Sequence, residues 1–119
     1  MIRFSICLML AASLTSSAQQ SHRVHITFVP QSDSLVAATH EYEGLWADEG
    51  ARIVAAMEQV SGLSFVYPAF ADTAITAIVF EGMSNSGYRE SPMHLRASYT
   101  PDTKRATLID ELGHRVSKL

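Results

Sequence analysis

Cysteine is almost absent from this chain of 119 residues, because the single cysteine, Cys7, lies close to the N-terminus. Removal of an N-terminal segment would leave no thiol, which excludes disulfides, cysteine nucleophiles and thiolate metal sites. Positive charge is also sparse: nine lysines and arginines stand against twelve aspartates and glutamates, and the net charge is −3. Since no basic block stands out, neither nucleic-acid binding nor attraction to a membrane surface has support.

A hydrophobic run long enough to span a bilayer is missing as well. Residues 4–14 form a short apolar run after Arg3, and residues 16–18 are small residues before the polar Gln19. This order of charge, apolar run and small residues is typical of a secretory signal peptide. We therefore predict a signal peptide at 1–18, export to the periplasm or the outside, and no membrane association after cleavage. The remaining residues, 19–119, suffice for one domain with one modest core.

Strand and helix patterns follow each other along this remaining part. Residues 22–29 alternate between apolar and polar side chains and predict a half-buried strand that Pro30 ends. Residues 41–61 change to helical spacing, with one apolar stripe formed by Trp46, Ile53, Met57 and Val60. Gly62 follows where a left-handed C-terminal cap is expected.

Three further β-rich runs lie at residues 63–67, 76–81 and 93–99. The last two are separated by a loop rich in glycine, serine and asparagine, so we expect them to form an antiparallel hairpin with a wide connection. The predicted fold class is α+β: a small mixed sheet, mostly antiparallel, with one long backing helix and a C-terminal helix. Thr100 as cap, Pro101 in the first turn and Asp102 at the positive end of the dipole predict where that last helix begins.

The last helix carries the residues with the clearest chemical pattern. The zinc-binding pattern H-E-x-x-H needs histidines at positions i and i+4 and a glutamate at i+1 that accepts a proton from water. Here Glu111 and His114 occupy the positions of the base and the second ligand, while Asp110 occupies the position of the first ligand. The alternative is a solvated helix face, on which Asp110 with His114, and Glu111 with Arg115, form two ordinary i,i+4 pairs.

The segment from Met93 to Arg115 resembles the core of the zincin metallopeptidases, in particular the Glu-zincin branch. The residues that carry the resemblance are the alternating 95–99 segment and the approach Thr107-Leu108-Ile109, followed by Glu111-Leu112-Gly113-His114. The resemblance implies a zincin-like upper subdomain, zinc as the cofactor, Glu111 as general base, and His114 and Asp110 as metal ligands. It also implies hydrolysis of an extended peptide or protein that pairs with the 95–99 edge strand.

Two departures from the family pattern lead us to expect a truncated or inactive form. Asp110 replaces the first histidine, and no residue after Leu119 can provide the third ligand. Among the other histidines, only His94 is expected near the helix. Whether the chain is an enzyme stays open at this point. The alternative function is that of an exported module, without enzymatic activity, that binds an extended peptide on the 95–99 edge.

Overall fold

A computed structural model describes residues 24–62, 74–87 and 91–117. The elements in chain order are β1 (His25–Pro30), the short 3-10 helix η2 (Asp33–Leu35), α2 (Val36–Ser61), β2 (Ala74–Phe80), β3 (Met93–Arg96) and α3 (Pro101–Ser117). The predicted signal peptide and the predicted strand at 63–67 lie outside the described residues. Within the described ranges, no helix has the length and apolar character needed to cross a membrane.

The three strands form one sheet in the order β1-β2-β3, and both pairs are parallel. The register pairs Phe28 with Ala77 and Ala77 with Met93. The prediction of a mostly antiparallel sheet is therefore wrong, although helices and strands both occur as an α+β fold requires. Alternation of apolar side chains reports which face of a strand is buried, and it carries no information about strand direction.

The connection between β2 and β3 explains why these two strands are not a hairpin. The chain leaves the end of β2 and returns along the outer edge of β3, where Asn85 makes an antiparallel bridge to His94. Asn85 N donates to His94 O over 2.9 Å, and His94 N donates to Asn85 O over 3.0 Å. β3 is thus inserted between β2 and its own preceding loop, which makes it parallel to β2.

The strand predicted at 93–99 ends at Arg96, and its outer edge is already occupied. Ala97 N donates inward to Phe80 O, while Arg96 N donates outward to the Ser84 side chain over 2.9 Å. Together with the bridge to Asn85, these bonds satisfy the outward amide groups of His94 and Arg96. An added peptide could pair with this edge only by displacing the 84–85 segment.

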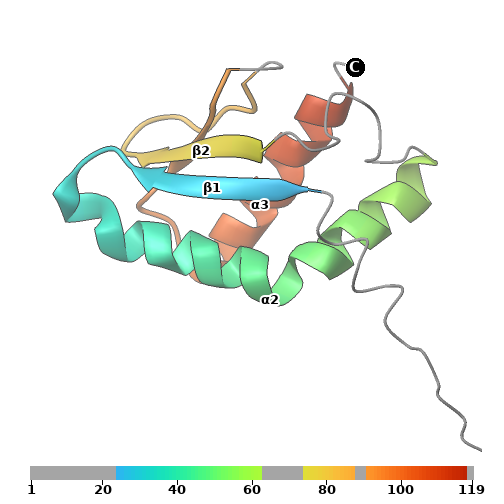
Figure 1. The fold of residues 1–119 in the computed structure, drawn as a ribbon, viewed down its shortest axis with the longest axis horizontal. Helices are drawn as coiled ribbons and strands as arrows, with labels where there is room; N and C mark the ends of the chain where they lie inside the picture. The colour runs from blue at the N-terminus through green and yellow to red at the C-terminus, as the bar shows by residue number, and fades with distance from the viewer. Residues whose placement is uncertain (1–23, 63–73, 88–90, 118–119) are drawn as a thin grey trace, which may run out of the picture.

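The core lies between one face of the sheet and both helices. Figure 1 shows α2 running alongside β1, with α3 behind the strands. The buried cluster joins residues of every strand and of both helices: Val24, Tyr42, Val54, Ile75, Ala77, Val79, Met93, Leu95, Ala97, Leu108 and Leu112. No helix among the described elements covers the opposite face of the sheet, which carries Val29, Phe80 and His94.

Helix α2 begins at Val36, five residues before the helical spacing becomes clear in the sequence. The predicted left-handed cap at Gly62 is confirmed, with φ at 73° and its amide donating to Glu58 O. Ile53 of the predicted stripe is buried, whereas Val60 is 88% exposed. The stripe therefore faces the core over the middle of α2 only, because the C-terminal turns extend past the sheet (Figure 1).

Candidate functional site

Helix α3 begins as its sequence predicts and is anchored there by a buried cation. Thr103 N donates to Thr100 Oγ1 over 3.3 Å, and Pro101 is the first helical residue. Lys104 is 3% exposed, and its Nζ donates to Glu41 Oε1 at 2.9 Å and to Tyr99 O at 2.8 Å. A buried ammonium needs such partners. These bonds tie the first turn of α3 to α2 and to the turn after β3.

Further along α3, the structure brings Asp110, Glu111 and His114 together. One ligand atom from each lies within 4.8 Å of the others. His114 Nδ1 is 3.8 Å from Asp110 Oδ2 and 3.9 Å from Glu111 Oε2. Within the described ranges, no other group of three or more histidine, cysteine or acidic residues could hold a metal ion.

The three side chains differ in their exposure. Those of Asp110 and His114 are 65% and 60% exposed, as the predicted polar face requires, but that of Glu111 is only 10% exposed. The helical pattern placed Glu111 on the solvated arc. Glu111 instead lines the same depression as Met83 and Ser84, so it lies at the boundary between α3 and the segment after β2.

The geometry of Asp110 and His114 can be compared with that of a zinc site. Two donors about 2.1 Å from one tetrahedral ion lie roughly 3.4 Å apart. The observed separation of 3.8 Å is therefore close to what a shared metal needs, and a small side-chain rotation would close the difference. One imidazole nitrogen with carboxylate oxygens is also a donor set that zinc accepts. The described residues fit a zinc ion with respect to these donors, and beyond Glu111 they bring no further histidine, cysteine or acidic side chain to the group.

His94 does not supply a further ligand. It alternates with Met93 and Leu95, which face the helices, and therefore points to the opposite face of the sheet. There its ring packs edge-on against Phe80, with ring centroids 5.0 Å apart. Its buried Nδ1 atom has no hydrogen-bond partner in the structure. The expectation that His94 lies near α3 is therefore wrong, because α3 packs against the face of the sheet that carries Met93 and Leu95.

An open depression lies beside the acidic part of the cluster. It has a volume of about 660 Å³ and is bounded by the loop after β2, by the turn after β3 and by α3. Its lining residues are Met83, Ser84, Tyr99, Ala106, Thr107, Ile109, Asp110 and Glu111. Apolar walls with carboxylates at one side can accommodate an extended segment of polypeptide next to the candidate metal ligands.

Sequence reasoning missed the role of Arg115, which holds the loop that forms this depression. Arg115 is 7% exposed, and its Nη1 donates to Ser86 O at 2.8 Å and to Ser91 O at 3.1 Å. Burial lowers the pKa of this guanidinium below its ordinary value. In the sequence, Arg115 has the spacing of an ordinary helix-surface partner for Glu111, so no local signal reveals the distant loop carbonyls.

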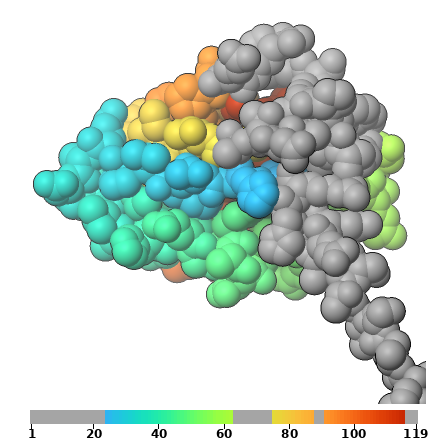
Figure 2. Space-filling model, in the orientation of Figure 1, coloured from blue at the N-terminus to red at the C-terminus, as the bar shows by residue number. Residues whose placement is uncertain are grey.

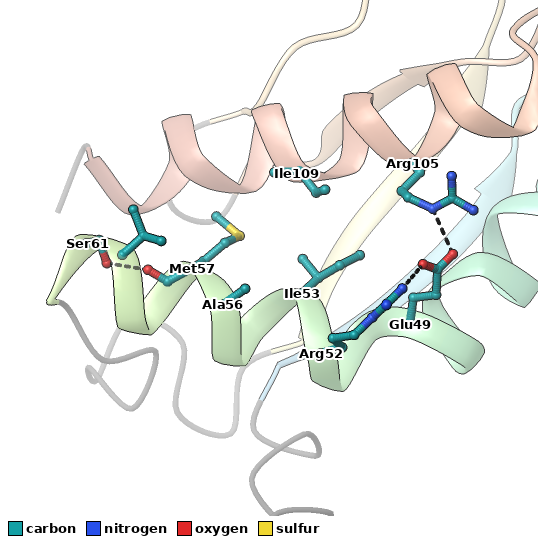
Figure 3. Close-up of a pocket in the computed structure, with 9 residues that line it drawn as sticks. Glu49, Arg52, Ile53, Ala56, Met57, Ser61, Arg105 and Ile109 are labelled. Atoms are coloured by element: carbon teal, nitrogen blue, oxygen red, sulfur yellow. Dashed lines mark hydrogen bonds and ion pairs between the residues drawn. The ribbon is translucent and has the colours of Figure 1, made fainter.

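A second, apolar groove lies between α2 and α3, away from the cluster (Figure 3). Its walls include Ile53, Met57 and Ile109, and its volume is about 620 Å³. Glu49 closes one end, where it accepts hydrogen bonds from Arg105 and Arg52. The hydrogen bond from Arg105 is the main reason why the pKa of Glu49 lies below its ordinary value of 4.5, and Arg52 contributes in the same direction.

No protein-family model, curated protein or solved structure matches this chain. The function must therefore be inferred from the residues and their arrangement alone.

Substitution of Arg115 tests the connection between α3 and the loop. Arg115→Met should lower the free energy of unfolding by about 3 kcal/mol, because the buried Ser86 carbonyl and the partly buried Ser91 carbonyl lose charge-assisted hydrogen bonds. Urea unfolding measures this change. Arg52→Met is the matched control, because the Arg52 side chain is 78% exposed and its ion pair should contribute less than about 1 kcal/mol. Equal losses in the two variants would contradict the assigned role.

Substitution of Glu49 tests the ion pairs that close the apolar groove. Because the folded-state pKa is lowered, the Glu49 carboxylate stabilises the protein above its ordinary pKa of 4.5. This contribution is lost as the pH falls through the lowered folded-state pKa. Wild type should therefore be more stable than Glu49→Gln at pH 7, and the difference should disappear in acid. Urea unfolding between pH 7 and pH 2 checks this, with Asp48→Asn as control; a difference independent of pH would contradict it.

Proposed function

We propose that this protein is an exported, zinc-metallopeptidase-like protein of the zincin type, with α3 as its metal-binding helix. The observation that carries the proposal is the cluster of Asp110, Glu111 and His114, whose donor atoms lie within 4.8 Å beside an open depression. The proposed substrate is an extended peptide or protein. Export rests on the apolar segment at 1–18 and the small residues that end it.

In this proposal the side chains have distinct roles. Asp110 and His114 would hold the zinc ion, and a bound zinc ion supplies a Lewis acid for water and for a peptide carbonyl. Glu111 would accept a proton from the attacking water as general base, since it is the least exposed of the three and lies 3.9 Å from His114. The depression would hold the polypeptide next to these groups.

The replacement of histidine by Asp110 weakens the chemistry that the site can perform. A carboxylate ligand adds negative charge next to the ion, so the ion activates water less strongly. Asp110 is also shorter than histidine, which places its oxygens nearer to the helix backbone. We therefore propose weak zinc binding and low or absent peptidase activity with the donors that the described residues supply.

The alternative function, peptide binding on the 95–99 edge, has less support. Strand β3 ends at Arg96, and segment 84–85 occupies its outward hydrogen-bonding groups. No observation therefore favours this edge over the metal-binding helix.

Zinc binding to the purified protein tests the proposal. We expect about one zinc per chain, loss of binding in His114→Ala, and retained binding in Glu111→Gln, because the base is not a ligand. Asp110→His should raise the zinc affinity at least tenfold, since it restores the stronger nitrogen donor. Isothermal titration, and metal analysis after equilibrium dialysis against buffer that contains zinc, provide these values.

His40→Ala is the matched control, because it removes an exposed histidine from α2, far from the cluster in the sequence. Zinc bound equally by wild type and His114→Ala would contradict the proposal, as would an affinity unchanged by Asp110→His. In that case the cluster would consist of ordinary helix-surface ion pairs.

A further inference from the structure

The outer edge of β1 is the starting point of a separate inference. Among the described strands, β1 pairs with β2 only. Gln31 N donates to Val79 O, so odd-numbered residues direct their backbone groups toward β2. Ile26 and Phe28 therefore direct their N–H and C=O groups away from the sheet. None of the hydrogen bonds within the described ranges uses these outward groups.

A depression runs beside this edge, between β1 and α2. It has a volume of about 320 Å³ and is lined by Ile26, Thr27, Phe28, Glu43, Trp46 and Ala47. Figure 2 shows β1 (blue) on the visible face of the molecule, directly above α2 (green). An exposed strand edge beside a depression with aromatic and polar walls is an arrangement that can bind extended peptides by strand addition.

The aromatic walls of this depression are held in place from behind. The ring of Phe28 stacks on that of Tyr42, with centroids 6.0 Å apart and an angle of 13°. Tyr42 is fully buried, and its hydroxyl donates to Arg96 O over 2.7 Å. On the helix side, Trp46 lies against Gly50, where a Cβ would come within 2.9 Å of the indole ring. A preformed surface of this kind lowers the entropic cost of binding.

We propose that β1 binds an extended peptide as an additional strand, with an apolar side chain in the depression and a basic side chain next to Glu43. Glu43 is the one charged residue of the lining and is exposed, so it favours lysine or arginine in the bound peptide. The proposal does not involve the cluster on α3, so its test is independent of the test for zinc binding.

The charge of Glu43 also decides between a peptide and a second copy of this chain. Two copies paired edge to edge around Thr27 would place two α2 helices side by side, with both Glu43 carboxylates at the same seam. Like charges at that seam disfavour the pair. The edge of β3 is not equivalent, because segment 84–85 already covers it.

The proposal can be tested with the peptide acetyl-Val-Thr-Lys-Thr-Val-Thr-Lys-amide. In an extended conformation this peptide presents valine and lysine on one face and threonine on the other. In NMR titrations of the ¹⁵N-labelled protein, we expect the amide signals of Ile26 and Phe28 to shift on binding. Their exchange with solvent should also slow at least tenfold, because the peptide satisfies their outward N–H groups.

Changes in the peptide keep the test independent of protein folding. N-methylation of alternate residues removes the donors needed for strand pairing and should weaken binding at least tenfold. Replacing both lysines by glutamate should weaken it about fivefold or more in wild type. Glu43→Gln should reduce this preference for lysine, whereas Asp48→Asn, a change on the same helix outside the lining, should keep it.

Ile26→Pro removes one outward donor without removing a ladder hydrogen bond and should weaken binding about tenfold. Equal affinity for the N-methylated peptide would overturn the proposal. So would signal shifts confined to residues outside β1 and α2, or an absence of binding at millimolar peptide. Shifts of the Ile26 and Phe28 signals that depend on protein concentration without peptide would assign this edge to a second copy instead.

Discussion

Arg115 carries the interaction on which the arrangement of the candidate site depends. Its guanidinium donates to the carbonyls of Ser86 and Ser91, which both belong to the connection between β2 and β3. In this connection, segment 84–85 lies along the outer edge of β3, and β3 is parallel to β2. The same contact holds the loop over α3, where Glu111 becomes buried.

Helix α3 is thus held at both ends by buried cations. Lys104 joins the first turn to Glu41 and to the Tyr99 carbonyl, and Arg115 joins the last turn to the loop after β2. Between these anchors, Leu108 and Leu112 are fully buried in the core. Asp110 and His114 project from the opposite side of the same turns. Their positions therefore follow from the packing of the helix, and a metal would bind to donors whose backbone is already fixed.

Local signals in the sequence predicted the parts of the fold that depend on neighbouring residues. Thr100 and Pro101 marked the start of α3, Gly62 marked the end of α2, and the i,i+4 spacing brought Asp110 close to His114. These features depend on backbone geometry within one or two turns.

The parts that were wrong or missed depend on contacts between distant segments. The alternation at 93–99 does not show that Ser84 and Asn85 cover the outer edge of β3. The spacing of Glu111 and Arg115 does not show that Arg115 is buried against loop carbonyls. His94 was expected near α3 because it lies on the polar face of its strand, but both helices pack on the other face, which carries Met93 and Leu95.

The imidazole nitrogen signals of His114 during a zinc titration test the central claim most directly. We expect one ring nitrogen of His114 to shift in a saturable manner at about one equivalent of zinc, while the signals of His25, His40 and His94 stay unchanged. The same titration of Asp110→Ala should require a much higher zinc concentration. A His114 signal that does not respond, or one that responds no more than the other histidines, would contradict a metal site on α3.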